Sequence, residues 1–353
     1  VLSRIFNISA KALFRNMPML AELLDETTNH LLLDQTDHIR LILKDTLTRL
    51  ESDLTQSGHI TASFRALSYG NDSFQFKDAV SGIGFYQFLR NLDRNFDSMA
   101  EEITANLKAV SKSLFTSERL IAAISCDNED YDLSAELLGK IYQPGRTSVE
   151  IAGDVSDKAA SVTSEGIITP GKIQYVAKAV KFGDLGFSFS GKLLVLKNII
   201  DLEYLWNTVR VQGGAYGCGC NFLRSGNLYM YSYRDPNLTR TLDLYDAAGK
   251  FIDGFQADER AMTNYIIGAV SSIDKPLNKE QKLKQVLVRR ITGMTNEIIQ
   301  AERDEVLSST CADMRAFAPM LKTIKDSRYI CVMGNADQIN KSAALFDRVT
   351  NFK

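Results

Sequence analysis

The sequence has few of the residues that bind metal ions or interrupt helices. Its 353 residues include three histidines, one tryptophan and six prolines. His30, His38 and His59 do not show the spacing at which two imidazoles on one helix face bind the same ion. Each is therefore interpreted as a surface or cap histidine, and we predict that this chain by itself binds no zinc.

Long apolar runs and an excess of charge of one sign are also missing. No uninterrupted apolar stretch approaches the about 20 residues that a membrane-spanning helix needs. The formal net charge of −2 at pH 7 argues against a general nucleic-acid-binding surface. We therefore expect neither a membrane nor a nucleic acid as a partner.

Cysteine is scarce as well, and the five present are Cys126, Cys218, Cys220, Cys311 and Cys331. An odd number at wide spacing predicts reduced thiols rather than a disulfide framework. This argues against secretion and indicates the cytoplasm, if the source is bacterial, or an organelle matrix. Cys218 and Cys220 share one face of an expected strand, but two further metal ligands at a suitable spacing are lacking. We interpret them as thiols of the core or of a cavity wall.

The most informative stretch of the chain lies between Trp206 and Cys220. Before it, apolar residues recur every three or four positions from Leu193 to Val209, which predicts a helix whose apolar face includes Trp206. After it, the pattern changes to that of a strand. Gly213 and Gly214 lie at the junction, where a helix end favours positive φ and a close backbone approach requires glycine.

A cation and a phenol flank these two glycines. Arg210 is permanently charged and carries five N–H donors, and Tyr216 carries one hydroxyl donor. Together they form a plausible grip for the carbonyl groups of a peptide that lies along a strand edge. We expect both side chains to open on one concave, solvent-accessible surface, with no buried carboxylate neutralising Arg210. Without further information, an ordinary helix-end cation and a strand-face aromatic would explain the same residues.

Residues 210–217 read Arg-Val-Gln-Gly-Gly-Ala-Tyr-Gly. This segment resembles the Arg-x-x-Gly-Gly-Ala-Tyr-Gly signature in the last domain of the pitrilysin/insulinase-type zinc metallopeptidases, in particular the presequence-protease and falcilysin branch. Tyr204-Leu205-Trp206 and the segment from Tyr233 to Leu238 resemble the same branch. The resemblance extends weakly along the whole chain. Gln212 departs from it, because a basic residue is expected there more often.

The resemblance implies the C-terminal half of a zinc-dependent metalloendopeptidase that degrades peptides in an enclosed chamber. Arg210 would then bind a backbone carbonyl of the substrate. Tyr216 would hydrogen-bond the scissile carbonyl as it becomes an oxyanion. Gly213, Gly214, Ala215 and Gly217 would contribute to substrate binding.

The same resemblance implies what this chain does not contain. The family binds zinc through His-x-x-Glu-His, with the Glu as general base, and that motif is absent here. We therefore expect zinc to be bound by an N-terminal half that is this chain's partner, with unfolded peptides as substrates and no activity in this chain alone. The first residue, Val1, is consistent with a C-terminal fragment.

Two other functions fit parts of the sequence. One is a catalytically inactive scaffold or partner subunit of the same fold, which binds peptides without cleaving them. The other is a nucleotide-dependent enzyme with a glycine-rich loop at 183–191 or 213–219. Neither loop has the spacing of a phosphate-binding motif, and the second follows a helix and precedes a strand, the reverse of a dinucleotide loop.

The chain is long enough for two α+β domains with separate cores. Residues 147–169 are rich in small and polar residues, which predicts a linker. We assign an incomplete third domain to 1–145, the linker to 146–169 and a fourth domain with the Arg210 motif to 170–353. Each domain is expected to pair a mixed or antiparallel sheet with helices on one face, as half of a chamber. The strands expected are 1–13, 120–125, 173–182 and 329–333, with a strand or loop at 60–67 and helices including 237–255 and 337–349.

Overall fold

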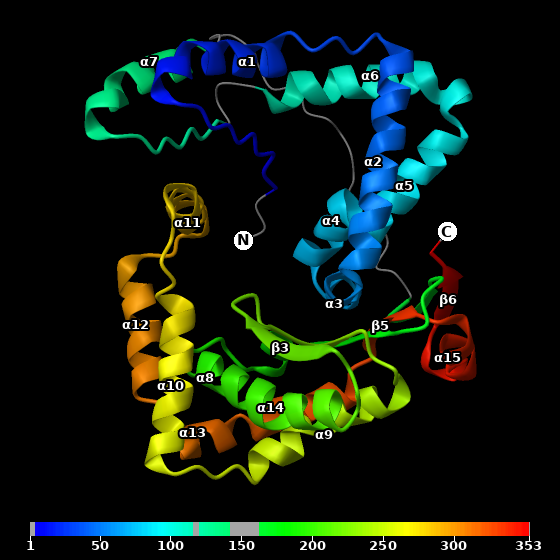
Figure 1. The fold of residues 1–353 in the computed structure, drawn as a ribbon, viewed down its shortest axis with the longest axis vertical. Helices are drawn as coiled ribbons and strands as arrows, with labels where there is room; N and C mark the ends of the chain where they lie inside the picture. Colours follow the sequence, from blue (N-terminus) through cyan, green and yellow to red (C-terminus); the bar gives the residue numbers. More distant parts are fainter. Residues whose placement is uncertain (1–3, 116–119, 142–161, 353) are drawn as a thin grey trace. The chain divides into compact units, whose positions relative to one another are not determined.

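The computed structural model describes residues 4–115, 120–141 and 162–352. Its elements form two compact units (Figure 1). Unit 1 comprises residues 1–47, 89–156 and 276–295, and unit 2 comprises residues 48–88, 157–275 and 296–353. Helices α2 (Thr36–Gln56) and α5 (Ile83–Arg94) contribute residues to both units.

The described residues of unit 1 form helices and irregular segments, with no strand among them. Its elements are η1 (Phe14–Asn16), α1 (Met17–Asn29), α6 (Phe96–Leu114), η3 (Asn128–Asp130), α7 (Tyr131–Lys140) and α11 (Lys279–Thr292). The strands expected at 1–13 and 120–125 are wrong, because residues 4–13 and 120–125 are irregular. A strand needs a neighbouring strand for its backbone hydrogen bonds, and the described part of this unit supplies none.

Unit 2 contains one six-stranded mixed sheet with the order β3-β4-β2-β5-β1-β6. The strands are β1 (Ser164–Ile168), β2 (Tyr175–Lys181), β3 (Gly217–Leu223), β4 (Asn227–Tyr233), β5 (Tyr329–Gly334) and β6 (Arg348–Asn351). Pairing is antiparallel from β3 to β5, and β1 runs parallel to both β5 and β6. The expected mixed α+β fold class is therefore confirmed.

Two sequence-based expectations fail at the margins of this sheet. Residues 164–168, assigned to the linker, form the buried strand β1, while 142–161 lie outside the described residues. The helix expected at 337–349 is instead α15 (Ala336–Lys341), η7 (Ala343–Leu345) and the edge strand β6. Both strands depend on partners far away in sequence, which local patterns do not reveal. The division into a third and a fourth domain remains a prediction.

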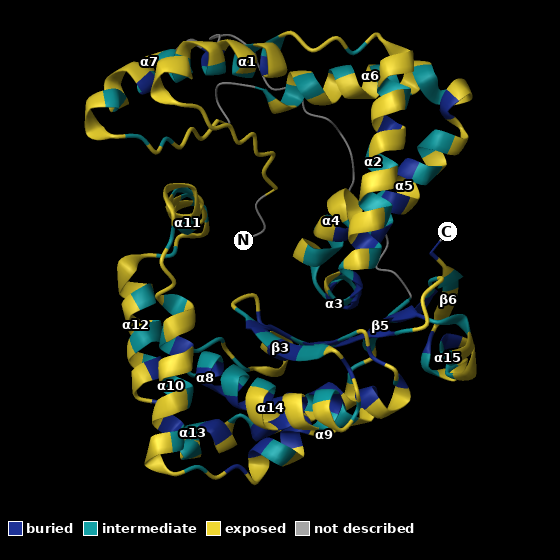
Figure 2. Cartoon of the chain, viewed as in Figure 1, coloured by how far each residue is buried: buried dark blue, intermediate teal, exposed yellow. Residues whose placement is uncertain are grey.

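Helices cover both faces of the sheet, not one face as expected. The remaining helical elements of unit 2 are α3 (Gly58–Ser68), α4 (Asp72–Ser81), η4 (Phe182–Leu185), α8 (Lys192–Ile199), η5 (Ile200–Val211), α9 (Thr239–Asp253), α10 (Glu259–Ile273), α12 (Asn296–Leu307), α13 (Cys311–Ala316), α14 (Ala318–Lys322) and η6 (Thr323–Asp326). The main core lies between the sheet and the layer of α8, η5, α9 and α14 (Figure 2). Helix α3 packs on the opposite face, against β2, β4 and β5.

Residues 60–67, expected as a strand or loop, belong to α3. Ala62 and Ala66 recur four residues apart and are fully buried, which is the spacing of one helix face. Gly58 continues this face, and a Cβ added there would lie 2.3 Å from the Tyr175 ring on β2. Small side chains therefore let this helix approach the sheet closely, and a short run of such residues carries little helical periodicity.

A buried ionic network joins α3 and α4 to the strands β1 and β6. Glu165 on β1 is 2% exposed and accepts hydrogen bonds from Arg65 Nε at 2.5 Å, Tyr69 Oη at 2.5 Å and Arg348 Nε at 2.6 Å. Arg65 also pairs with Asp78 of α4 at 2.5 Å. Burial alone would raise the pKa of Glu165, but the hydrogen bonds and charge of Arg65, with Tyr69 and Arg348, lower this pKa below its ordinary value.

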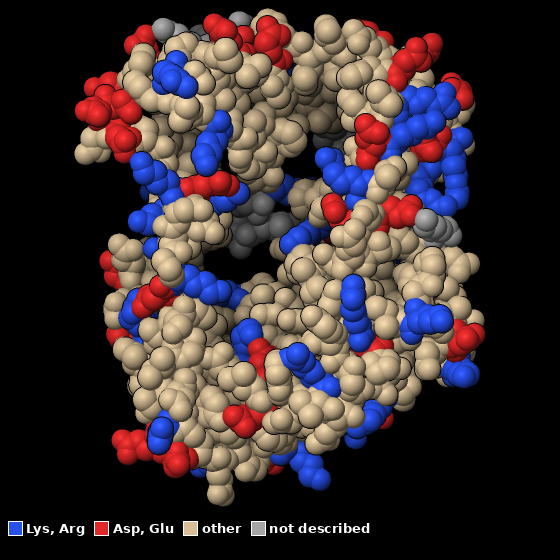
Figure 3. Space-filling model, viewed as in Figure 1, with Lys and Arg blue, Asp and Glu red and all other residues tan. Residues whose placement is uncertain are grey.

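The surface and the helices give no sign of a nucleic-acid or membrane partner. On the face shown in Figure 3, Lys and Arg side chains are interspersed with Asp and Glu, as expected for a net charge of −2. No helix within 4–115, 120–141 and 162–352 is both long and apolar enough to cross a membrane.

Candidate functional site

The helix that leads to the conserved-looking Arg and Tyr is wider than an α-helix in its last part. Helix α8 continues into η5, a π-helix in which backbone bonds reach back five residues, as in Gln212 N–H to Asn207 O at 3.0 Å. The apolar periodicity of an α-helix therefore does not hold to its end. Leu205 and Val209 are buried as expected, but Trp206 is 47% exposed and leaves the apolar face to which the sequence assigned it.

Trp206 instead supports Arg210, four residues further on. The guanidinium carbon of Arg210 lies 3.7 Å from the centroid of the Trp206 ring, a cation–π contact. Arg210 forms no ion pair with any carboxylate of the described residues. The stacked ring fixes the plane of the guanidinium without neutralising its charge, and the N–H groups along its edge stay available.

Each of the two glycines after Arg210 meets a different backbone requirement. Gly214 has φ of 82°, a left-handed conformation. At Gly213, an added Cβ would lie 2.4 Å from the carbonyl oxygen of Val209. Positive φ and a close backbone approach are the two reasons that the sequence suggested for this pair. The turn they form directs the chain from the helix into β3.

A side chain from a distant segment fixes this turn. Asn237 Nδ2 donates to the Gly213 carbonyl oxygen at 2.6 Å. Asp235 is fully buried and accepts from Asn237 N at 2.8 Å and Thr241 Oγ1 at 2.7 Å. The expectation that Asp235 caps a helix beginning at residue 237 is wrong, because α9 begins at Thr239 and Asp235 orders the loop before it.

Tyr216 follows the turn, at the start of the edge strand β3. Its backbone N–H donates to the carbonyl oxygen of Tyr233 at 3.0 Å, and its ring meets the Tyr233 ring edge-on at 5.7 Å. Ala215 beside it is buried and anchors the segment, whereas Tyr216 is 68% exposed. No described residue hydrogen-bonds the Tyr216 hydroxyl, so its donor points to solvent.

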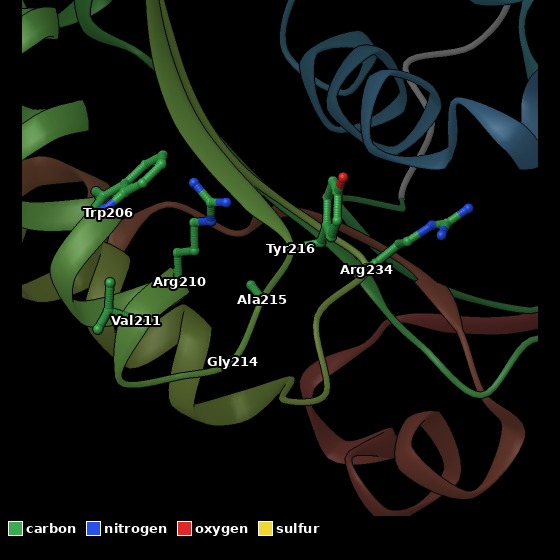
Figure 4. A pocket seen from close by; sticks show the side chains of 7 residues that line it. All are labelled: Trp206, Arg210, Val211, Gly214, Ala215, Tyr216 and Arg234. Carbon is green, nitrogen blue, oxygen red and sulfur yellow. The ribbon is translucent and has the colours of Figure 1, made fainter.

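These residues share one open pocket, shown in Figure 4, whose lining is Trp206, Arg210, Val211, Gly214, Ala215, Tyr216 and Arg234. The guanidinium of Arg210 lies between the Trp206 and Tyr216 side chains, and Arg234 lies on the other side of Tyr216 (Figure 4). The structure thus brings Arg210, Gly214, Ala215 and Tyr216 together. Gly213 and Gly217, also expected at the site, shape the chain beside the pocket but do not line it.

Sequence reasoning missed Trp206, Val211 and Arg234 as pocket residues. Trp206 and Arg234 belong to the two further segments that carried the family resemblance, and no role followed from them. A Trp-x-x-x-Arg spacing at a helix end is the signal that could have identified the Trp206 contact.

The cysteines of β3 do not form a reactive centre. Burial, reinforced by Asp201, raises the pKa of Cys218 to about 12 and that of Cys220 well above its ordinary value. Both thiols are therefore neutral near pH 7, and neither is poised as a nucleophile or metal ligand. Among the residues that the structure describes, no group of three His, Cys, Asp or Glu side chains is placed to hold a metal ion.

Two family models match this chain. Residues 164–335 match the model described as PreP C-terminal domain, and residues 2–92 match a model of a domain associated with the C subfamily of M16 peptidases. The chain belongs to the M16 peptidase family, in its presequence-protease branch. The match of 164–335 includes every residue that lines the pocket.

Curated relatives of this family member are longer proteins. The chain is 35% identical over 346 residues to Protein HypA of Clostridium perfringens, covering 97% of the chain and 35% of that protein. It is 30% identical over 296 residues to presequence protease 1 of Arabidopsis thaliana, covering 83% of the chain and 27% of that protein. The chain thus spans about a third, or less, of the length of these relatives.

Solved structures show the same fold at low sequence identity. Pitrilysin superposes with a TM-score of 0.55 at 10% identity, covering 90% of this chain and 33% of that one. A protease from Helicobacter pylori gives a TM-score of 0.52 at 11% identity, covering 90% of this chain and 76% of that one.

Proposed function

We propose that this chain provides the substrate-binding and oxyanion-binding part of a zinc-dependent metalloendopeptidase that degrades peptides in an enclosed chamber. One observation carries the proposal: Arg210 and Tyr216 line the same open pocket with donors that no described carboxylate or acceptor occupies. Membership of the M16 family supports peptide hydrolysis as the reaction. The metal-binding half is a separate part of the full-length protein or a second chain.

In this proposal Arg210 binds a backbone carbonyl of the peptide. Its guanidinium has five N–H donors in one plane, and the Trp206 ring at 3.7 Å covers one face of that plane. Donors along the edge can then meet a carbonyl oxygen from a fixed direction. The role is to place the chain, so that the bond to be cleaved comes to rest beside Tyr216.

Tyr216 acts on the reacting group itself. As water adds to the scissile carbonyl, its oxygen gains negative charge and becomes a stronger hydrogen-bond acceptor. A hydroxyl donor placed for that oxygen stabilises the transition state more than the bound substrate, which raises kcat. Because the ring rests edge-on against Tyr233 at 5.7 Å, Tyr216 presents its hydroxyl from a packed support.

Zinc bound elsewhere in the full-length protein would activate the attacking water and polarise the carbonyl. The described residues contain no ligand group for it, so this chain contributes binding and oxyanion stabilisation only. The free cysteines agree with the proposed reducing compartment, the bacterial cytoplasm or an organelle matrix.

The first test separates a peptidase from an inactive scaffold. We expect the full-length protein to contain stoichiometric zinc by elemental analysis and to cleave a quenched fluorescent peptide until a chelator is added. This chain alone should contain no zinc and cleave nothing. Stoichiometric zinc in this chain, or cleavage that resists chelation, would contradict the proposal. A full-length protein that binds peptides without cleaving them would be the scaffold.

A second test concerns the support of Arg210. In the full-length protein, Trp206→Leu should raise KM about fivefold with little change in kcat, because an exposed cation–π contact contributes up to about 1 kcal/mol. Trp206→Phe keeps an aromatic face and should retain most of the affinity. In an Arg210→Ala background, Trp206→Leu should have no further effect. A full additional loss in that background would mean that Trp206 contacts the substrate directly.

A further inference from the structure

Arg234 occupies a backbone conformation that does not suit it. Its φ is 50°, and among residues 4–115, 120–141 and 162–352 it is the only non-glycine residue with positive φ. This left-handed region favours glycine or asparagine, because a larger side chain there brings its Cβ close to the backbone. A strained residue that is retained beside a pocket is a reason to ask what its side chain does there.

The surrounding backbone holds Arg234 in this conformation from both sides. The N–H of Tyr216 lies 3.0 Å from the Tyr233 carbonyl oxygen and 3.4 Å from that of Arg234. On the other side, Asp235 exchanges two backbone hydrogen bonds with Gln174, each of 2.8 Å. The turn itself therefore does not require an arginine, and glycine or asparagine would meet its conformation with less strain.

The side chain of Arg234 keeps its charge available. It is exposed, and its guanidinium carbon lies 5.4 Å from the centroid of the Tyr233 ring. The pKa of Tyr175 is raised by burial, and Arg234 opposes this shift, so both aromatic neighbours of Arg234 are neutral. No described carboxylate pairs with Arg234.

The pocket therefore contains two guanidinium groups and no acid. Its seven lining residues include Arg210 and Arg234 but no Asp or Glu. The two arginines lie on opposite sides of Tyr216 (Figure 4). A ligand that matches this pocket should carry a negative charge, since a planar guanidinium binds a carboxylate through two parallel hydrogen bonds.

We propose that Arg234 is a specificity-determining residue that binds a carboxylate of the peptide substrate. The inference rests on the proposed function, in which Tyr216 meets the scissile carbonyl and Arg210 a carbonyl to one side of it. The carboxylate then lies on the other side of the cleaved bond from the residue that Arg210 holds. It belongs either to an Asp or Glu side chain or to the C-terminus of the peptide.

The test uses the full-length protein and matched peptides. Each peptide carries Glu, Gln or Lys at one position near the cleavage site, and one pair ends in a free acid or an amide. We expect kcat/KM to favour Glu over Gln about fivefold at one position, on one side of the bond only, as for a partly exposed ion pair. If the C-terminus is the source, the acid–amide pair shows the preference instead.

Three variants separate charge from structure. Arg234→Asn tolerates the left-handed backbone and removes the charge, so the preference should fall to about one while the Gln peptide is cleaved as before. Arg234→Lys should keep part of the preference, and Arg234→Glu should favour the Lys peptide. Equal loss for all peptides in Arg234→Asn would overturn the inference, as would a wild-type protein indifferent to charge at every position.

Failure of the proposed function gives a different result. If the full-length protein cleaves no peptide, the dissociation constants of the same labelled peptides are measured by fluorescence anisotropy. A Glu preference in binding that Arg234→Asn removes would support Arg234 as the carboxylate-binding residue and leave hydrolysis disproved. Binding without such a preference would overturn both.

Discussion

Tyr216→Phe in the full-length protein is expected to lower kcat by about a hundredfold or more, the scale of a lost oxyanion donor. The change keeps the ring against Tyr233 and removes only the hydroxyl. KM should change little, because the hydroxyl is proposed to act on the charge that develops in the transition state. Steady-state kinetics on a quenched fluorescent peptide measure both constants.

Two comparisons make this result specific. The side chain of Tyr216 is 68% exposed, so Tyr216→Phe should leave the thermal unfolding midpoint unchanged. Tyr131 in α7, 56% exposed, provides a matched control, and Tyr131→Phe should change neither kcat nor KM. An unchanged kcat in Tyr216→Phe would reduce this tyrosine to packing and remove the main support for catalysis at this pocket.

Arg210→Ala is expected to act differently, by raising KM as well as lowering kcat/KM. Arg210 is proposed to hold a carbonyl that does not react, and such binding is present in the bound substrate and the transition state alike. The two variants together thus separate positioning from transition-state stabilisation.

The sequence predicted the parts of this site that lie in one short segment. Gly213, Gly214 and the two residues that flank them can be interpreted locally, because a helix end, a positive φ and a following strand each leave a mark in adjacent residues. Trp206 was assigned to the apolar face because an α-helix was assumed. The widened helix η5 exposes it, and nothing in the spacing of Leu205 and Val209 reveals that widening.

Features that depend on distant partners were predicted poorly. Strand β1 begins Ser164-Glu165, which suggests a polar linker until Arg65 and Arg348 are seen to neutralise the glutamate. Helix α3 covers a face of the sheet that was expected to be open, because its small residues only make sense against the Tyr175 ring. In both cases the physical reason lies about a hundred residues or more away in sequence.

The largest effect on stability is expected at the same buried glutamate. Glu165→Gln keeps the shape of the side chain but removes the charge that faces Arg65 and Arg348. The two guanidinium groups then share only Asp78 and solvent, and removing one partner of a buried ion pair typically costs about 3 kcal/mol or more. Urea unfolding monitored by circular dichroism should show this loss in the free energy of unfolding.

A surface pair provides the matched control. Glu280 and Lys284 lie one turn apart on α11, 3.0 Å apart and exposed to water. Glu280→Gln should leave the unfolding midpoint unchanged, because exposed ion pairs contribute little. A similar loss in both variants would mean that the network around Glu165 is no stronger than a surface contact.

The pH dependence of stability should identify the ionised carboxylate as the cause. The folded-state pKa of Glu165 is lower than its ordinary value of 4.5. Its contribution is therefore fully present above pH 4.5 and is lost as the pH falls through the lower folded-state value. Between those values the free energy of unfolding of the wild-type protein should fall more steeply with decreasing pH than that of Glu165→Gln. Equal slopes for the two proteins would mean that Glu165 is held as a neutral acid, and the loss at neutral pH would then come from altered hydrogen bonding rather than charge.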